Sequence, residues 1–186
     1  MKALFQEKSV SIPEGCKVAL VDKKFVFEGK LGRQEYDVSK IKFTFEVLED
    51  EILIKSWHCN RFKIQLLNTI YSHIKNHITG VTVGFKFVLR SVYRHFPIQI
   101  AINNNGKEVK VLSFIGSKEE RTYPVRGESV AMMGEMKDTI VIQGINLNDV
   151  SQTASSISTG CFRRKKHDER IFVDGIYIQQ KTTMVN

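Results

Sequence analysis

The stretch that decides the fold is residues 80–98, GVTVGFKFVLRSVYRHFPI. Between residues 81 and 93 most odd positions are apolar or aromatic, whereas the cations Lys86, Arg90 and Arg94 occupy even positions. Side chains alternate between the two faces of a strand, so this spacing predicts a strand with one face in a core. The three cations are expected to project together from its other face.

The sequence around this stretch is depleted of acids. No Asp or Glu lies between Glu51 and Glu108, although this interval holds four of the five histidines. Its cations are Lys55, Arg61, Lys63, Lys75, Lys86, Arg90, Arg94 and Lys107. The chain of 186 residues carries a formal net charge of +8, and together these features favour a polyanionic partner.

Composition indicates a folded protein without a disulfide framework. A hydrophobic fraction of 42% and a charged fraction of 26% are ordinary for soluble domains and are enough to form a core. Cys16, Cys59 and Cys161 are far apart and form no C-x-x-C pair, so neither disulfides nor a zinc site are predicted. No apolar run has the length of a membrane span, and the first residues lack the apolar core of a signal peptide, which predicts an intracellular, soluble chain.

The two halves of the chain repeat one plan. An offset of 87 residues lays Gly29 on Gly116, Tyr36 on Tyr123 and Val38 on Val125. Each half then reads as short strands, a hairpin and a helix, in that order. The predicted fold class is α+β: a tandem duplication of two similar small domains, each with antiparallel or mixed sheets packed on one α-helix.

Helix signals set the predicted boundaries. Residues 61–78 carry an apolar stripe at helical spacing, with Asn60 as a candidate N-cap and Gly80 as a candidate end. The second helix is expected over residues 148–159. We therefore predict a first repeat over residues 1–79 and a second over 80–178. Residues 179–186 read as a polar C-terminal tail with too few apolar groups to become ordered.

The sequence contains no convincing catalytic constellation. His73 and His77 are four residues apart on the first helix, but no third metal ligand accompanies them. The glycines at positions 80 and 84 fit no phosphate-loop or dinucleotide spacing. Phe85, Phe87 and Tyr93 share the apolar face of their strand, so a core role is favoured over a base-stacking platform. No catalytic residue, metal, cofactor or small-molecule substrate is predicted.

The cations instead form a candidate RNA-binding set. Lys and Arg side chains neutralise phosphates and can recognise folded RNA by its shape without reading bases. The candidates are Lys86, Arg90, Arg94, Arg121, Arg126, the run Arg163, Arg164, Lys165, Lys166, and Arg170.

Several separate motifs resemble one known family. They are residues 80–98; Trp57, Asn60 and Arg61 with TIYSHI at 69–74; residues 138–144; and FVDGIY at 172–177. Almost end to end, the chain resembles the universal large-subunit ribosomal protein number six in its archaeal and eukaryotic form, which eukaryotes call large-subunit protein nine. The resemblance implies two homologous α+β domains and no catalysis.

The resemblance also implies a location and partners. It predicts a structural constituent of the cytosolic large ribosomal subunit that binds large-subunit rRNA mainly through the second domain. The contacts would lie near the factor-binding region and the sarcin-ricin loop, beside neighbouring large-subunit ribosomal proteins. It implies no membrane partner.

Two other functions are weighed against this one. An RNA-processing enzyme or ribosome maturation factor could share the basic surface, but it would need an acidic or His-centred cluster. Binding to a membrane surface would need lysines flanking the apolar stripe of the first helix, which carries only Arg61, Lys63 and Lys75.

Overall fold

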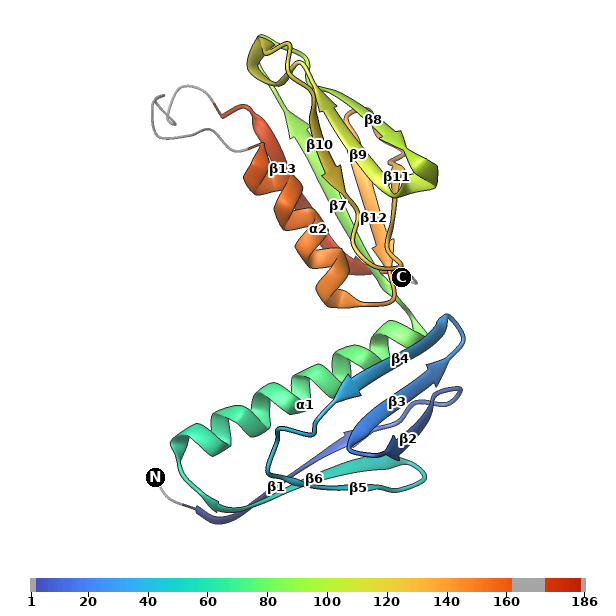
Figure 1. The fold of residues 1–186 in the computed structure, drawn as a ribbon, viewed down its shortest axis with the longest axis vertical. Coiled ribbons are helices and arrows are strands. Elements are labelled where there is room, and N and C mark those ends of the chain that lie inside the picture. Colours follow the sequence, from blue (N-terminus) through green and yellow to red (C-terminus); the bar gives the residue numbers. More distant parts are fainter. Residues whose placement is uncertain (1–2, 162–172, 185–186) are drawn as a thin grey trace. The chain divides into compact units, whose positions relative to one another are not determined.

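The chain folds into two compact units, Met1–Val83 and Gly84–Asn186, called unit 1 and unit 2 below. The computed structural model describes residues 3–161 and 173–184 (Figure 1). The boundary predicted between residues 79 and 80 falls inside a helix that continues to Thr82. The division between the units therefore comes a few residues later than the sequence suggests.

Unit 1 contains two three-stranded sheets and one long helix. The sheets have the strand orders β1-β6-β5 and β2-β3-β4, with antiparallel pairing throughout. Helix α1 packs against β1, β3, β4 and β6. The elements are β1 (Ala3–Ser11), β2 (Lys17–Val21), β3 (Lys24–Gly29), β4 (Gly32–Asp37), β5 (Thr44–Val47), β6 (Glu51–Cys59) and α1 (Arg61–Thr82).

Unit 2 contains a four-stranded sheet, a three-stranded sheet and a shorter helix. The strand orders are β11-β12-β7-β13 and β10-β9-β8, again antiparallel. Helix α2 packs against β7, β10, β12 and β13 (Figure 1). The elements are β7 (Phe85–Val92), β8 (Gln99–Asn103), β9 (Glu108–Leu112), β10 (Arg121–Pro124), β11 (Val130–Met133), β12 (Thr139–Gly144), α2 (Leu147–Gly160) and β13 (Gly175–Thr183), with 3-10 turns η1 (Asn104–Gly106) and η2 (Phe114–Gly116).

The two units share one topology, which confirms the predicted duplicated α+β fold. The order β1-β6-β5 in unit 1 corresponds to β7-β12-β11 in unit 2, and β2-β3-β4 corresponds to β8-β9-β10. In unit 1 the helix α1 follows directly after β6, and in unit 2 the helix α2 follows directly after the corresponding strand, β12. Strand β13 has no counterpart among the described residues of unit 1.

Helix α1 begins as predicted but ends later. The Asn60 side chain accepts a hydrogen bond from the backbone N–H of Lys63 at 2.9 Å, so Asn60 is the N-cap. Gly80 does not end the helix, because α1 continues to Thr82, and Gly80 lies on the buried face of the helix. The left-handed residue that follows the helix is Gly84, with φ of 74°.

Strand β7 is central in unit 2 and supplies its core. Phe87 and Leu89 are buried and pair in register with Ile142 and Ile140 of β12. The side chains of β9 and α2 complete the same cluster. The placement of Phe85 and Phe87 in the core is confirmed, and Tyr93 packs against it. The predicted strand is shorter than the periodicity suggested, since Val81 and Thr82 belong to α1.

Residues 179–183 belong to strand β13, contrary to the prediction of an unordered tail beyond residue 178. Strand β13 continues to Thr183 and pairs with β7, with Thr182 opposite Lys86. Its polar side chains do not prevent this, because the backbone of β7 supplies the hydrogen bonds. A register shift between Ile178 and Gln180 marks a bulge in the pairing.

Candidate nucleic-acid interface

Strand β7 places Lys86 and Arg90 on the outer face of the four-stranded sheet. Phe87 and Leu89 point into the core, so the residues that alternate with them face away from it. Arg90 is exposed, whereas Lys86 is half-buried. Both cations thus stand where the sequence pattern predicted.

Arg94 does not belong to this stripe. Strand β7 ends at Val92, so strand alternation no longer fixes the direction of Arg94. Its backbone N–H donates to Oδ1 of Asp174 at 3.2 Å, which ties the turn after β7 to the start of β13. The side chain is exposed, and the prediction of three cations on one strand face was wrong for this residue.

A polar hollow lies at the end of β7. It is lined by residues of β7 and of the turn before β12: Arg90, Ser91, Val92, Tyr93, Lys137 and Asp138. The Tyr93 hydroxyl donates to Oδ2 of Asp138 at 3.0 Å, and this hydrogen bond raises the pKa of Tyr93. The hollow thus brings together two cations, Arg90 and Lys137, and the carboxylate of Asp138, which accepts from the Tyr93 hydroxyl.

Lys137 is a candidate that sequence reasoning missed. It belongs to the segment GEMKD at residues 134–138, where acidic residues lie on both sides, so it is not part of a basic run in the sequence. Only the pairing of β12 with β7 brings this turn beside Arg90.

Arg121 has a role within unit 2. Its guanidinium donates to the carbonyl oxygen of Gly160 at 2.7 Å and lies 4.4 Å from the ring centroid of Phe114. A cation at the last carbonyls of a helix also interacts favourably with the helix dipole. Arg121 therefore stabilises the C-terminal end of α2, immediately before the basic run in the sequence.

Two side chains beside Arg121, those of Tyr123 and Cys161, have raised pKa values. Burial raises the pKa of Tyr123 to about 12, and its hydroxyl lies 3.5 Å from Sγ of Cys161. Burial also raises the pKa of the Cys161 thiol. A thiol that stays protonated at neutral pH is a poor nucleophile, so this pair indicates packing rather than catalysis.

Arg126 lies in the loop between β10 and β11, on the α2 side of unit 2. Its backbone N–H donates to Oγ1 of Thr153 on α2 at 3.1 Å, while its side chain is exposed. The nearby Lys107 is engaged within the unit, because its ammonium donates to the carbonyl oxygens of Gly127 and Ser129. Of these two cations, Arg126 is the better placed for an outside partner.

The densest predicted cations, Arg163, Arg164, Lys165, Lys166 and Arg170, lie outside the described residues. The residues that flank this segment are nevertheless close together. A Cβ atom on Gly175 would lie 3.3 Å from the carbonyl oxygen of Cys161. Since Asp174 also accepts from the backbone N–H of Arg94, the described residues that follow this segment lie beside Arg94.

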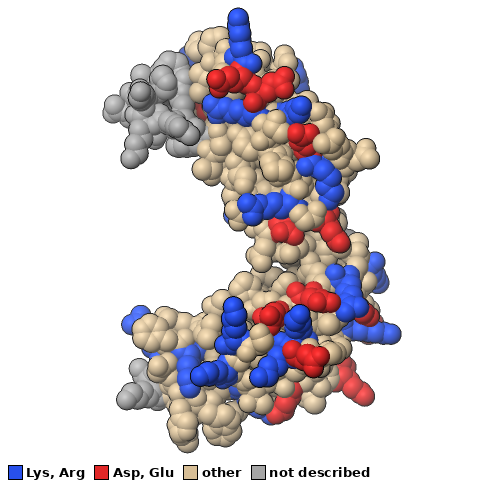
Figure 2. All heavy atoms as spheres, in the orientation of Figure 1, with Lys and Arg blue, Asp and Glu red and all other residues tan. Residues whose placement is uncertain are grey.

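Charge on the visible face of unit 2 is mixed. Figure 2 shows Lys and Arg interspersed with Asp and Glu rather than gathered into one basic area. On this face a phosphate partner would therefore meet particular cations and not a uniform field.

Two other kinds of site were sought in residues 3–161 and 173–184. Within these ranges no group of three or more His, Cys, Asp or Glu side chains could hold a metal ion. No helix among them is long and apolar enough to cross a membrane.

The fold and its surface define a class of protein: two copies of a small α+β domain, with Arg90 and Arg94 exposed at the end of strand β7. No family model matches the chain. Relatives of similar length do match it, among them large ribosomal subunit protein uL6 of Tetrahymena thermophila, 35% identical over 191 residues and covering 100% of both chains. Protein uL6B of Saccharomyces cerevisiae is 35% identical over 189 residues, covering 100% of this chain and 98% of its own. Protein uL6 of Ignicoccus hospitalis is 34% identical over 189 residues, covering 98% of each chain.

The chain therefore belongs to the uL6 family of large ribosomal subunit proteins. This confirms the resemblance seen in the sequence, including its archaeal and eukaryotic type. The family is one of structural ribosomal proteins, and the chain is not an enzyme.

Proposed function

We propose that this chain is a structural constituent of the cytosolic large ribosomal subunit and that unit 2 binds large-subunit rRNA. The observation that carries the proposal is similarity along the full length to proteins named for that subunit in a ciliate, a yeast and an archaeon. A net charge of +8 agrees with a phosphate-rich partner.

The contacts would be electrostatic and would recognise the shape of the RNA. Lys86 and Arg90 stand on the outer face of β7, and Arg94 follows at its end. Arg126 is exposed near α2. With Arg163, Arg164, Lys165, Lys166 and Arg170 they would neutralise phosphates and orient the protein, while Arg121 would hold the end of α2 in place.

The family resemblance supports a proposal for the place on the subunit. We expect the contacts to lie near the sarcin-ricin loop and the factor-binding region, with neighbouring large-subunit proteins beside unit 1. The division of roles agrees with the location of the candidate cations, all of which belong to unit 2.

Sedimentation of a lysate through a sucrose gradient, before and after a high-salt wash, tests the proposal. The protein is expected in large subunits and translating ribosomes both before and after the wash. Peripheral phosphate contacts are weakened by salt because bound counterions return to the RNA. A protein found only on precursor particles, or released readily by salt, would instead be a maturation factor.

A further inference from the structure

Strand β1 has an open edge: within residues 3–161 and 173–184, no strand pairs with the side of β1 that faces away from β6. Strand β1 pairs with β6 from Ala3 to Ser11 without a register shift. A strand at the edge of a sheet presents a row of backbone N–H and C=O groups to any further strand. Because β1 contains no proline, no N–H is missing from this row.

The hydrogen bonds show which residues of β1 supply the open row. In an antiparallel ladder every second residue bonds to the partner strand, and the residues between them direct their backbone groups the other way. The N–H of Ile12, just beyond β1, donates to the carbonyl oxygen of Asp50 at 2.8 Å. Even-numbered residues of β1 therefore bond to β6, whereas Glu7, Ser9 and Ser11 direct N–H and C=O to the open edge.

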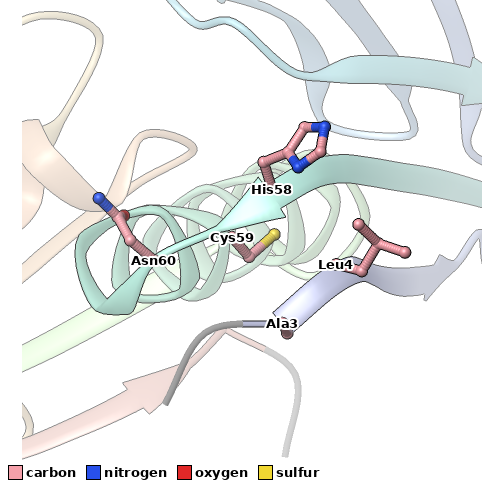
Figure 3. Close-up of a pocket in the computed structure, with 5 residues that line it drawn as sticks. All are labelled: Ala3, Leu4, His58, Cys59 and Asn60. Atoms are coloured by element: carbon pink, nitrogen blue, oxygen red, sulfur yellow. The ribbon is translucent and has the colours of Figure 1, made fainter.

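The edge is less regular at the start of β1. His58 of β6, across from Leu4, has φ of 51°, outside the range of a strand. A small pocket lies there, where β6 passes into α1 (Figure 3); it is lined by Ala3, Leu4, His58, Cys59 and Asn60. We therefore restrict the candidate surface to the backbone of Glu7, Ser9 and Ser11, and call it the β1 edge.

The equivalent edge of unit 2 belongs to β7. Each of the two strands, β1 and β7, pairs with the strand that precedes the helix of its unit. Their ladders also have the same phase, because the N–H of Ser91 donates to the carbonyl oxygen of Asp138 at 2.9 Å, as that of Ile12 does to Asp50. Counting back from Ser91 and from Ile12 therefore gives matching positions in β7 and β1.

In unit 2 this edge is occupied by β13. The residues of β7 that match the β1 edge are Lys86, Val88 and Arg90, and each of them has a partner in β13. The row continues at Gly84, whose carbonyl oxygen accepts from the N–H of Met184 at 3.2 Å. One copy of the duplicated fold thus shows that the edge accepts an added antiparallel strand.

We infer that the β1 edge binds an extended segment of another protein, which joins the sheet as a strand antiparallel to β1. The backbone of this segment would pair with Glu7, Ser9 and Ser11, as β13 pairs with β7. This inference rests on the proposed function, because a neighbouring large-subunit protein would supply the segment.

The two faces of β1 indicate which side chains the segment carries. On the α1 face the Lys8 ammonium lies 4.9 Å from the ring centroid of Tyr71, which is half-buried. On the other face Phe5 is exposed and packs on Trp57, with 4.7 Å between ring centroids. Side chains of adjacent strands contact each other on both faces of a sheet, so apolar residues of the segment would cover these rings.

A protein strand fits the β1 edge better than RNA or a second copy of this chain. Phosphates accept hydrogen bonds but donate none, so they would leave the carbonyl groups of the edge unpaired. In a symmetric pair of β1 strands centred on Glu7 or on Lys8, that residue would stand opposite its own copy. Like charges directly opposite each other are destabilising.

Photocrosslinking in intact subunits tests the inference. The full chain, with p-benzoylphenylalanine in place of Ser11, is expressed in cells so that it assembles into large subunits, which are then purified and irradiated. A second chain carries the probe at Thr44, an exposed residue of β5 on the opposite edge of the same sheet. The adducts are digested with ribonuclease or with protease, and the attached peptides are sequenced by mass spectrometry.

The expected adduct at position 11 is destroyed by protease and contains one segment of a large-subunit protein. Ser9→Pro removes an N–H that points to the open edge and keeps the ladder to β6, and it should lower the adduct per incorporated chain about tenfold. Ser9→Ala loses the same hydroxyl but keeps the N–H, so it should leave the yield unchanged.

Hydrogen exchange gives a second readout that needs no substitution. In the free parent chain the amide of Ser9 should exchange rapidly and that of Val10, bonded to β6, slowly. In the large subunit the Ser9 amide should slow by about tenfold or more, because it gains a backbone partner. This measurement decides the question if Ser9→Pro alters the circular dichroism spectrum of the free chain.

Other results would overturn the inference. They are no protein adduct at position 11, an adduct destroyed by ribonuclease, an adduct to a second copy of this chain, the same segment captured from position 44, an equal loss in Ser9→Ala, or a Ser9 amide that exchanges equally fast in the subunit. A parent chain absent from the purified subunits would instead overturn the proposed function and, with it, the inference.

Discussion

Ser91 and Ser129 are both buried in unit 2, but their hydroxyl groups differ in hydrogen bonding. The Ser91 hydroxyl donates to the carbonyl oxygen of Asp138 at 3.1 Å. Among the described residues the Ser129 hydroxyl has no hydrogen-bond partner, although Ser129 is only 2% exposed. A buried polar group without a partner costs about 1–3 kcal/mol of stability.

Opposite effects of the same substitution are therefore expected at these two positions. Ser129→Ala should raise the free energy of unfolding by about 1 kcal/mol, and Ser91→Ala should lower it by a similar amount. Urea denaturation of the two variants and the parent chain measures both values. Destabilisation by Ser129→Ala would show that the hydroxyl has a partner after all.

His77 makes the stability of unit 1 depend on pH. Its ring stacks on Phe27 at 5.5 Å between centroids, and Nδ1–H donates to Oε1 of Gln34 at 2.6 Å. Burial, with a smaller effect of the neighbouring His73, lowers the pKa of His77 from its ordinary value of 6.5. The folded state therefore holds His77 neutral more strongly than the unfolded chain does.

The sign of the pH dependence follows from this shift. Well above pH 6.5, His77 is neutral in both the folded and the unfolded state, so its contribution to stability is fully present. Below pH 6.5 the unfolded state gains a proton first, so the free energy of unfolding falls as the pH approaches the lowered pKa. His77→Gln should remove this part of the profile, measured by urea denaturation between pH 5 and 8. His95→Gln, at an exposed position, serves as the control. An unchanged profile in His77→Gln would contradict the assignment.

At the scale of elements, α1 depends on its N-cap. Asn60 accepts from the backbone N–H of Lys63, and loss of such a cap costs about 1 kcal/mol. Asn60→Ala should therefore lower the free energy of unfolding by about this amount. Asn68→Ala makes the same change at an exposed position inside the helix, where Ala has the higher helix propensity, and should not destabilise. Thermal denaturation of both variants compares them; equal effects would mean that the cap contributes nothing.

The two helices illustrate how one plan is realised with different sequences. Helix α2 also begins after an Asn cap, since the Asn146 side chain accepts from the backbone N–H of Asn148. Its exposed face is rich in Ser and Thr, whose helix propensity is low. Val150, Ala154 and Ile157 are fully buried, so tertiary packing maintains a helix that the sequence alone would form weakly.

At the scale of the whole molecule, the question is which cations bind RNA. Each phosphate contact contributes about one unit to the dependence of log K on log salt concentration. If Arg90 and Arg94 both contact phosphates, the double variant Arg90→Gln/Arg94→Gln should weaken binding to large-subunit rRNA and reduce the slope by about 2. Filter binding at several salt concentrations measures it.

A matched control comes from unit 1. Lys40 and Lys42 are exposed, and changing both to Gln removes two positive charges, as the Arg90→Gln/Arg94→Gln double variant does. The double variant Lys40→Gln/Lys42→Gln is expected to leave the slope unchanged, and an equal loss in both units would argue against a localised interface. Arg121→Gln should act differently: the hydrogen bond to Gly160 is lost, so stability falls while the salt slope changes little.

The sequence by itself determined the features that rest on local patterns. Repetition along the chain predicted the duplicated fold, Asn60 was identified as a cap, and the alternation around Phe87 and Leu89 showed which side of β7 enters the core. These predictions succeed because helix caps and strand faces depend on residues only a few positions apart.

Only the tertiary structure decided where β7 ends, that β13 extends its sheet, and which cations are already engaged. Thr182 bonds to the backbone of Lys86 across 96 positions, and Arg121 bonds to Gly160 across 39. Periodicity carries no information about such distant partners. The sequence therefore predicted an unordered tail and an Arg121 free to bind RNA. In the fold, residues 179–183 pair with the backbone of β7, and Arg121 bonds to the end of α2.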